Sequence, residues 1–377
     1  MPVRALASVN LAAIERNCVR LARELSESAA LGAVVKADGY GHGATVTARA
    51  ALAGGASWLC VATADEAAAL RADGIDARVL VMGALSPGEL EVALAAAADV
   101  VAWREPFVAR AAAAAAASAP ARVHVKLDTG MGRLGTRDPA EADRVAAAVA
   151  AAPGLELAGA MTHLATADEL DDGGFFDEQL ARFSRWAGAL RSAHPSIVLH
   201  AANSAAILRD AASHFDLVRA GIAVYGMDPF HEDPATRGLE PVLALTSYVG
   251  DLKHCEPGES AGYGRRFVAA QATELAVLPI GYGDGVRRGL TNNADALIGG
   301  RRYPLVGTVS MDNITIDVGA DPAVAVGDAV TLIGVDGAER VTAEDVARRL
   351  QTINYEVTCG ISARVPRHHH RDGEAAQ

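Results

Sequence analysis

Residues 31–43, Leu-Gly-Ala-Val-Val-Lys-Ala-Asp-Gly-Tyr-Gly-His-Gly, join a short apolar run to a glycine-rich turn. The run from Leu31 to Val35 is typical of a buried strand, and it brings Lys36 to the point where that strand ends. Such a lysine has an ordinary explanation, because its long stem can carry the ammonium group to water. It can also be a Schiff-base lysine, since burial lowers the pKa of the amine and the stem lets the nitrogen reach an aldehyde.

The three glycines of this turn, Gly39, Gly41 and Gly43, favour the second explanation. Glycine lets the backbone approach a ligand closely. Tyr40 and His42, which stand between the glycines, can donate hydrogen bonds to an anion such as phosphate. The turn therefore predicts a Schiff-base lysine beside an anion site.

Length and composition indicate a chain with room for more than one domain. At 377 residues, it exceeds one typical domain, so two are expected unless a barrel takes most of it. Hydrophobic residues make up 51% of the chain, but many are alanines, as in residues 111–117, and alanine favours helix. No run reaches the roughly 18 strongly apolar residues of a membrane helix, and no signal peptide is evident, so we expect a soluble protein without a membrane partner.

Charge and cysteine usage narrow the class of partner. A net charge of -12 argues against a nucleic-acid binder, whose phosphate contacts require a basic face, so small-molecule chemistry is expected. The four cysteines have no C-x-x-C pair, which is typical of reduced thiols in a cytoplasmic protein rather than of a disulfide framework or a zinc site. The polar segment 367–377, which contains His368 to His370, predicts a disordered tail rather than a metal site.

Apolar runs alternate with alanine-rich helical segments over the first two thirds of the chain. Asn10 is a plausible N-cap for a helix at Leu11–Glu27. With the strand before Lys36, about eight strands alternate with helices, which is the signature of an α/β fold of the (β/α)8 TIM-barrel type. We place this barrel at residues 10–235. The other seven predicted strands are Trp58–Ala62, Arg78–Met82, Val100–Trp103, Val123–Leu127, Leu157–Met161, Ile197–His200 and Leu217–Ala220.

A second domain is expected after a linker. Residues 232–239 shift to proline, glycine and charge, which marks a boundary. Beyond it, glycine turns separate short strands, and one helix is predicted at Ala343–Gln351. We therefore predict a mainly β C-terminal domain at residues 236–366, to which residues 1–9 add a strand. The predicted strands are Val242–Leu252, Glu274–Ile280, Tyr303–Val306, Ile314–Val318 and Ala329–Ile333.

Polar side chains follow the barrel strands at the ends where a barrel carries its active site. These residues are Lys36, Arg133, His163, Asn203, Ser204 and Arg219. Ser204 and the backbone amides of Gly221 and Ile222 would favour an anion, although Asn203-Ser204 can equally be an ordinary helix cap. Arg219 stands between apolar residues at a strand end, where an isolated charge is costly, so we favour a functional role over a surface salt bridge.

The segment Val-Val-Lys-Ala-Asp-Gly-Tyr-Gly-His-Gly at 34–43 resembles the pyridoxal-phosphate lysine motif of the alanine racemase family. Further segments resemble that family in the same order, and together they cover nearly the whole chain. The sequence departs from the family pattern at Asp38-Gly39, where Asn-Ala is more frequent, at Leu164, where Phe is frequent, and at Thr308, where Arg is frequent. The matching segments are 126–133, 161–163, 200–204, 218–222, 261–264, 280–285, 309–312 and 354–356.

The resemblance implies that Lys36 holds pyridoxal 5'-phosphate as a Schiff base. It implies that His163 packs beside the ring and that Arg219, held by His200, faces the pyridine nitrogen. Because arginine effectively never gives up its proton, it would leave the ring a weaker electron sink, which favours returning a proton to Cα over transamination. The residues implied to bind the phosphate group are Tyr40, Ser204, Gly221, Ile222 and Tyr355, and Asn203 is implied to bind the cofactor.

Racemisation needs a base on each face of Cα, and the resemblance implies Lys36 on one face. Tyr263, reaching in from a second protomer together with Met311, would serve the other face, so a homodimer is expected. A free tyrosine has a pKa near ~10, so Tyr263 would need nearby cations, which the His163–Arg219 cluster would provide.

Four further residues have implied supporting roles. Arg133 would contact the substrate carboxylate and the cofactor oxygen, and a carbamylated Lys126 would orient it. Pairing of Lys126 with Asp128 stays open as the alternative. Tyr282 would line the entrance, and Asp312 belongs to the supporting shell.

The implied function is interconversion of L-alanine and D-alanine, which would supply peptidoglycan synthesis or serve alanine catabolism. Serine is a second candidate substrate, since hydrophobic pockets reject an added hydroxyl by only about 10². A decarboxylase of the same barrel type would be expected to place an acid, not Arg219, at the pyridine nitrogen. A non-catalytic cofactor carrier would lack residues 240–366, and a cofactor-free aldolase would not need the phosphate cluster.

Overall fold

The computed structural model describes residues 3–115, 120–319 and 323–375 of the chain. These residues form two compact units. The barrel domain comprises Ile14–Gly39 and Gly43–Val224, and the β domain comprises Met1–Ala13, Tyr40–His42 and Tyr225–Gln377. The short segment at residues 40–42, within the glycine-rich turn, therefore groups with the β domain although the chain around it belongs to the barrel.

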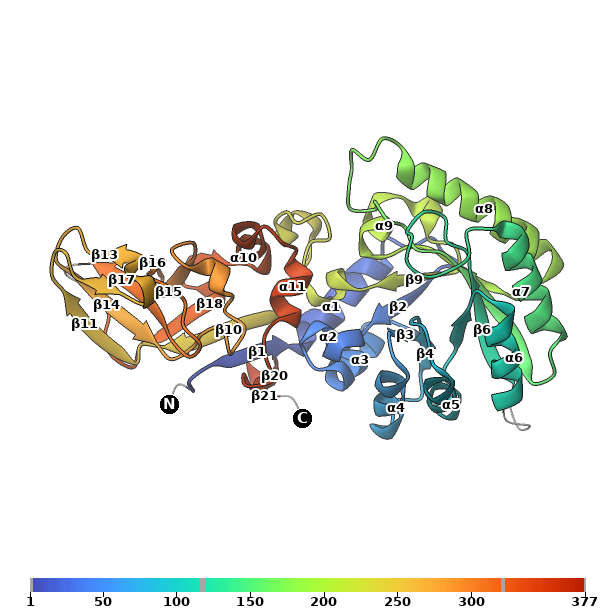
Figure 1. The fold of residues 1–377 in the computed structure, drawn as a ribbon, viewed down its shortest axis with the longest axis horizontal. Coiled ribbons are helices and arrows are strands. Elements are labelled where there is room, and N and C mark those ends of the chain that lie inside the picture. The colour runs from blue at the N-terminus through green and yellow to red at the C-terminus, as the bar shows by residue number, and fades with distance from the viewer. Residues whose placement is uncertain (1–2, 116–119, 320–322, 376–377) are drawn as a thin grey trace. The chain divides into compact units, whose positions relative to one another are not determined.

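Eight parallel strands form the barrel domain, which confirms the predicted (β/α)8 fold (Figure 1). They lie in two four-stranded sheets, β4-β3-β2-β9 and β5-β6-β7-β8. A parallel bridge between Leu80 and Asp99 joins the sheets on one side, and the N–H of Asp216 donates to the carbonyl of Leu199 over 3.0 Å on the other. The strands are β2 (Ala30–Val34), β3 (Trp58–Val61), β4 (Arg78–Val81), β5 (Val100–Ala102), β6 (Ala121–Lys126), β7 (Leu155–Met161), β8 (Val198–His200) and β9 (Leu217–Ala220).

Side chains cap the starts of four helices of the barrel domain, α4, α5, α7 and α9. Thr63 and Glu66 form a capping box at the start of α4, and Ser86 and Glu89 form another at α5. The first helix ends at Ala22, five residues before the predicted end, and residues 116–117 of the predicted alanine helix lie outside the described residues. The helices are α1 (Leu11–Ala22), α3 (Ala44–Ala53), α4 (Ala64–Ala72), α5 (Pro87–Ala95), α6 (Glu105–Ala114), α7 (Pro139–Ala151), α8 (Phe175–Ala193) and α9 (Ser204–Arg209).

The β domain is built on one large sheet with strand order β11-β14-β17-β16-β15-β18-β10-β1-β20-β21, and β19 pairs with β18. The segment predicted as one strand at 242–252 is two strands, β10 and β11, because the N–H groups of Val249 and Gly250 pair with different neighbours, Asp328 and Val277. The strands are β1 (Leu6–Asn10), β10 (Leu243–Tyr248), β11 (Asp251–Cys255), β14 (Thr273–Leu278), β15 (Asp295–Ile298), β16 (Arg301–Val306), β17 (Ile314–Gly319), β18 (Ala329–Asp336), β19 (Glu339–Val341), β20 (Arg367–Arg371) and β21 (Glu374–Ala375).

Smaller elements complete the β domain. Strands β12 (Ser260–Ala261) and β13 (Phe267–Val268) form a separate hairpin. Helix α10 (Ala343–Leu350) lies where the sequence predicts it, but a second helix, α11 (Asn354–Cys359), was not predicted. The strand that the sequence assigned to residues 1–9 is β1, which begins at Leu6, ends at Asn10 and pairs antiparallel with β10.

The prediction of a disordered tail at 367–377 is wrong for residues 367–375, and residues 376–377 lie outside the described part. Strand β20 pairs in parallel with β1, from Ala7 opposite Arg367 to Asn10 opposite His370. Arg367 donates its Nε to the carbonyl of Gly41 over 3.0 Å, and His369 Nε2 lies 2.9 Å from the carbonyl of His42. These polar side chains bind backbone carbonyls, which composition alone does not reveal.

The boundary between the domains also differs from the predicted one between residues 235 and 236. The structure places it after Val224. Residues just beyond this point are held by the β domain: the Asp228 N–H donates to Glu344 Oε1 over 3.0 Å, and the ring of Tyr225 stacks on that of Tyr40 at 4.9 Å. Within the described residues, no helix is both long and apolar enough to cross a bilayer, and no cluster of His, Cys, Asp and Glu side chains is suited to a metal ion.

Candidate active site

The turn that follows β2 is left-handed. Ala37, Asp38, Gly39 and Tyr40 have φ values of 52°, 54°, 61° and 53°. This conformation costs roughly 1–2 kcal/mol per non-glycine residue, and such strain gathers at functional sites. Asp38-Gly39, where the sequence departs from the family pattern, fits this geometry. Glycine adopts a left-handed conformation without cost, and Asp38 Oδ1 stabilises the turn by accepting the Ala44 N–H over 2.9 Å.

Glu66 fixes the same turn from a different element. Its Oε1 accepts the N–H of Ala37 over 2.7 Å, while its Oε2 accepts the N–H groups of Ala62 and Thr63. Glu66 therefore holds the residue next to Lys36 as well as the start of α4. The spacing of Thr63 and Glu66 signals a helix cap, but nothing in the sequence signals the contact with residue 37, so sequence analysis missed it.

Cationic side chains gather at the carboxyl ends of the barrel strands. Lys36, Lys126, Arg133 and Arg219 are close enough for their charges to act on His163. Burial, followed by the charges of Arg219 and Arg133, lowers the pKa of the Lys126 amine to about 8. The chain has three lysines in all, and two of them belong to this group, which we call the cation cluster. A cluster of this kind suits an anionic ligand.

His163 is neutral within the cation cluster. Burial, and then the charge of Arg219, hold the pKa of its imidazole well below its usual range. Its Nδ1 lies 3.2 Å from Nη2 of Arg219, whose two N–H groups are shared between this nitrogen and two backbone carbonyls. A neutral ring can pack against an aromatic ligand without adding charge. It also means that His163 does not supply the positive charge that sequence analysis assigned to it.

Arg219 is buried at the end of β9 and is held by several acceptors. Its Nη1 donates to His200 Nδ1 over 2.9 Å, and its Nη2 donates to the carbonyls of Thr162 and Ala201, each over 2.9 Å. The predicted contact between Arg219 and His200 is therefore present. Burial lowers the pKa of the guanidinium to about 10, so it stays charged near neutral pH and acts as a donor.

Ser204 lies at the start of α9, where the sequence predicted an anion site. Its Oγ accepts the N–H of Gly221 over 2.8 Å and that of Ala223 over 3.3 Å. The Asn203 side chain caps α9 by accepting the N–H of Ala206 over 3.0 Å, which is the ordinary role left open by the sequence. Ile222 is fully buried. A phosphate group bound here would compete with Ser204 Oγ for the hydrogen bond that the Gly221 N–H donates.

The loop after β6 holds Asp128, the residue that the alternative explanation for Lys126 requires. Asp128 accepts hydrogen bonds from the backbone of Gly130 and Gly132 and from Arg137, each over 3.1 Å. Within the described residues, no ion pair joins Asp128 to Lys126 at 4 Å or less. Arg133 lies exposed in the same loop. The charge of Asp128 nevertheless acts to raise the pKa of the Lys126 amine, so the two groups interact without forming an ion pair.

Two tyrosines predicted to bind phosphate come together within the β domain. The ring centroids of Tyr40 and Tyr355 are 5.8 Å apart, and Tyr40 stacks on Tyr225. Asn354 holds the start of α11, since its Nδ2 donates to the carbonyl of Asp228 over 2.8 Å and to Glu344 Oε1 over 2.9 Å. Tyr355 is thus presented by a buried polar network that the sequence pattern did not show.

Tyr263 occupies the tip of the β12–β13 hairpin, and its side chain is 74% exposed. Its carbonyl accepts a hydrogen bond from Thr308 Oγ1 over 2.6 Å. A Cβ at Gly262, where φ is +73°, would lie 2.9 Å from the Thr308 nitrogen. The departure at Thr308 therefore has a structural use, because this side chain ties the Tyr263 tip to the next loop. Leu164, another departure from the family pattern, has a buried apolar side chain.

Met311 and Tyr282 lie on two loops that are joined by backbone hydrogen bonds. The N–H of Gly283 donates to the carbonyl of Met311, and that of Tyr282 donates to the carbonyl of Ser310, each over 2.9 Å. Both side chains are exposed, Met311 by 51% and Tyr282 by 43%. Tyr263, Tyr282 and Met311 are thus all exposed side chains of the β domain.

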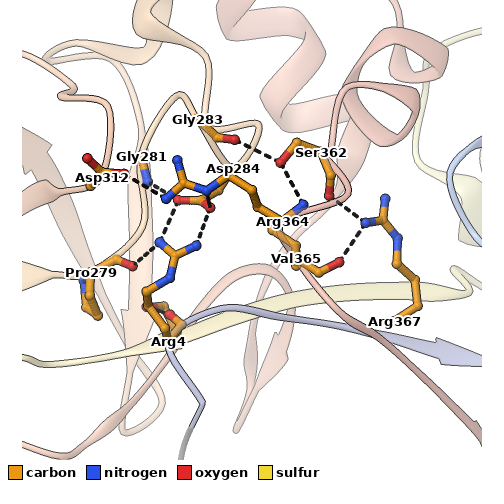
Figure 2. Close-up of polar contacts among 11 residues, drawn as sticks. Arg4, Pro279, Gly281, Gly283, Asp284, Asp312, Ser362, Arg364, Val365 and Arg367 are labelled. Atoms are coloured by element: carbon orange, nitrogen blue, oxygen red, sulfur yellow. Dashed lines mark hydrogen bonds and ion pairs between the residues drawn. The ribbon is translucent and has the colours of Figure 1, made fainter.

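A buried carboxylate anchors these loops (Figure 2). Asp284 accepts from Nη1 and Nη2 of Arg4 over 2.9 and 2.5 Å, and Arg364 joins it to Asp312, from which Arg364 Nη2 lies 2.7 Å. Burial alone would raise the pKa of the Asp284 carboxyl, but hydrogen bonds from Arg4 and the Gly281 N–H outweigh it and leave the pKa below its usual value. Asp312, which was predicted as a supporting residue, is joined to this carboxylate through Arg364, whereas Arg4 and Arg364 were missed.

Profiles of two protein families match the chain. The one described as alanine racemase, N-terminal domain, matches residues 9–229, and the one described as alanine racemase, C-terminal domain, matches residues 242–369. The chain belongs to the alanine racemase family. This confirms the resemblance drawn from the motifs, and it makes the chain an amino-acid racemase, an enzyme of the isomerase class.

Individual alanine racemases resemble the chain over its length. That of Symbiobacterium thermophilum is 43% identical over 363 residues, 96% of each chain. That of Nostoc sp. is 40% identical and covers 97% of this chain and 95% of its own. The crystal structure of the Bacillus anthracis alanine racemase with bound L-Ala-P has a TM-score of 0.91 and 35% identity, and covers 100% of this chain and 97% of that chain. The alanine racemase of Streptomyces coelicolor A3(2) has the same TM-score at 37% identity, with 97% of both chains covered.

Proposed function

We propose that this racemase interconverts L-alanine and D-alanine with pyridoxal 5'-phosphate attached to Lys36, and with one catalytic base from each of two protomers. The observation that carries the proposal is the cation cluster. Four positive side chains around a neutral imidazole repel one another, and anions relieve that repulsion. The phosphate of the cofactor and the carboxylate of alanine are such anions, so the residues present fit both.

The chain's own residues have separate tasks in this proposal. Pyridoxal phosphate, when bound, supplies the electron sink that stabilises Cα after it loses a proton. Arg219 would donate a hydrogen bond to the pyridine nitrogen without protonating it, because the guanidinium keeps its proton. Neutral His163 packs beside the ring. Residues that would hold the phosphate are Tyr40, Ser204, Gly221, Ile222 and Tyr355, and Asn203 would bind the cofactor.

Lys36 would move the proton on one face of Cα, and Tyr263 of the partner subunit would move it on the other. A catalytic side chain that is 74% exposed in one protomer needs a covering surface. A homodimer in which Tyr263, Met311 and Tyr282 enter the partner's site would provide it, and Met311 would narrow the substrate pocket there. We propose a cytoplasmic enzyme whose D-alanine serves peptidoglycan synthesis or whose activity serves alanine catabolism.

Polarimetry of the purified, cofactor-loaded protein tests the substrate. L-alanine should lose its optical rotation completely, L-serine should react within about 10² of that rate, and L-lysine should not react. Faster racemisation of lysine than of alanine would refute the proposed substrate. Release of carbon dioxide from alanine would instead favour the decarboxylase alternative.

Lys126 is proposed to carry a carbamate. Its neutral amine would attack carbon dioxide, form an N–C bond and release one proton. With a pKa of about 8, about half of the amine is neutral at pH 8, which favours this reaction. The new negative charge would lie among Arg133 and Arg219 and would orient Arg133 toward the substrate carboxylate.

Carbon-13 NMR with labelled bicarbonate tests the carbamate. The chain has only Lys36, Lys126 and Lys253 as lysine sites, which simplifies the assignment. We expect one carbamate signal that disappears in Lys126→Arg. The matched control, Lys253→Arg, changes an exposed lysine and should keep the signal. A signal that survives Lys126→Arg, or no signal in the unmodified protein, would rule the carbamate out.

A further inference from the structure

A continuous chain of buried hydrogen bonds runs through the barrel interior from Arg219 to Asp99. Arg219 Nη1 lies 2.9 Å from His200 Nδ1, His200 Nε2 lies 2.8 Å from His124 Nδ1, and His124 Nε2 lies 2.9 Å from Asp99 Oδ2. Asp99, His124 and His200 have no exposed surface. The four residues come from β9, β8, β6 and the residue before β5, so they link four strands of the barrel.

The donor and acceptor types fix the direction of every bond in this chain. Arginine only donates, so His200 Nδ1 must be the acceptor and its proton must be on Nε2. That proton points at His124 Nδ1, which places the proton of His124 on Nε2, facing the carboxylate. Burial lowers the pKa of both imidazoles, well below the usual range for His200, so each ring carries one proton.

Asp99 is a carboxylate and can end the chain as an acceptor. Burial acts to raise the pKa of this group, but the hydrogen bonds and charges of His124 and Arg78 outweigh it and set the pKa at about 2. Arg78 Nε donates to Oδ2 over 2.9 Å, and Arg122 Nε donates to Oδ1 over 2.6 Å. The negative charge is thus present at neutral pH, and two arginines hold the carboxylate in place together with His124.

Packing holds His124, in the middle of this series of hydrogen bonds, in one position. A Cβ on Gly159, in the neighbouring strand β7, would lie 2.2 Å from His124 Nδ1, so the imidazole occupies the space that this glycine leaves. The His124 ring meets that of His200 edge-on, with centroids 4.9 Å apart, and that of Trp58 at 5.9 Å. The ring has no room to turn over, and its tautomer is therefore set by its two partners.

We propose that Asp99 and His124 are positioning residues for Arg219: they fix the tautomer of His200 so that the lone pair of Nδ1 always faces the guanidinium group. Neither residue belongs to the cation cluster, and Asp99 lies at the opposite end of the barrel strands from it. The Asp99 charge polarises both imidazoles and makes His200 Nδ1 a stronger acceptor, which holds Arg219 charged and in one orientation. The catalytic part of this inference rests on the cofactor-facing role of Arg219 proposed above.

Asp99→Asn is the variant that separates positioning from simple packing. The asparagine amide keeps the size of the side chain but can donate to His124 Nε2. When the amide N–H faces His124 Nε2, the hydrogen bonds reverse and an Nδ1–H of His200 faces an N–H of Arg219, so that two donors meet. When the amide oxygen faces His124 Nε2, the tautomers stay as they are, but the charge of the carboxylate is lost. The same change in the aspartate of serine-protease triads preserves geometry but leaves the wrong histidine tautomer.

Nitrogen-15 NMR of histidine-labelled, cofactor-loaded enzyme reads the tautomers directly. In the unmodified enzyme, His124 and His200 should both carry the proton on Nε2. In Asp99→Asn, a fraction of His200 should carry its proton on Nδ1, and kcat/KM should fall by about 10- to 100-fold, as is common when an outer partner of an active-site group is lost. Arg122→Gln, the matched control, removes another hydrogen bond of the same carboxylate and should leave both tautomers unchanged and kcat/KM within about twofold.

A proton on Nδ1 of His200 in the unmodified enzyme would overturn the proposal, whether or not Asp99→Asn folds. A changed tautomer in Asp99→Asn without loss of kcat/KM would also overturn it, because positioning would then have no catalytic effect. Failure of the proposed function is seen separately, as an unmodified enzyme that does not racemise alanine although its histidines have the expected tautomers.

Discussion

Lys36→Ala is expected to abolish racemisation and to remove the covalently held, yellow form of the cofactor. The variant loses both the attachment point and the base on one face of Cα. General acid–base catalysis alone contributes about 10²–10⁴-fold, and enzymes commonly gain 10⁶-fold or more, so losing the base together with correct cofactor placement should leave almost no turnover. Absorbance of the purified protein and polarimetry of L-alanine measure the two effects.

Borohydride reduction followed by peptide mapping identifies the attachment site without relying on activity. With three lysines in the chain, we expect the cofactor on the peptide that contains Lys36 and on no other. Lys253→Ala is the control, since this side chain is largely exposed on β11 and pairs with Asp251. A cofactor label on Lys126 in the unmodified protein would contradict the assignment.

Tyr263→Phe is expected to lower kcat by about 10²–10⁴-fold and to leave the cofactor bound, because only the proton carrier is removed. Its backbone contact with Thr308 does not involve the phenol, so the loop should keep its position. Exchange of the Cα proton with deuterated water should continue from one enantiomer only, since Lys36 still serves its face. Tyr303→Phe is a matched control on β16 and should change neither rate.

Mixing the two inactive variants tests whether the bases come from different protomers. A mixed dimer of Lys36→Ala and Tyr263→Phe has one site with both native residues if the proposal is right. Since half of randomly paired dimers are mixed, about a quarter of the unmodified activity should return. If Tyr263 served its own protomer, every site would lack one base and no activity would return.

The barrel was predictable because its eight strands and the helices between them follow one repeating apolar pattern. The residues at the strand ends were predictable for the same reason, since strand ends meet at one face of a barrel. Lys36, His200 and Arg219 therefore appear where the sequence placed them. The family motifs added Tyr263 and Met311, for which the pattern of strands gave no signal.

The features that sequence analysis missed depend on contacts between distant residues. His124 is two residues before Lys126 on β6, so alternation along a strand places both side chains on the same face, and this was a usable signal. Its partners Asp99 and His200 come from other strands, and their distances exist only after folding. The tail was misjudged because Arg367 and His369 are polar in composition, yet they bind the carbonyls of Gly41 and His42.

The grouping of residues 40–42 with the β domain limits how this enzyme can be recombined with its relatives. Within that domain, a side chain at Gly41 would lie 2.4 Å from the carbonyl of Thr358, and Arg367 binds the Gly41 carbonyl. A chimera with a single crossover near Val224 would combine one parent's tripeptide with the other parent's α11 and β20. Functional hybrids should therefore take all three segments of the β domain, Met1–Ala13, Tyr40–His42 and Tyr225–Gln377, from the same parent.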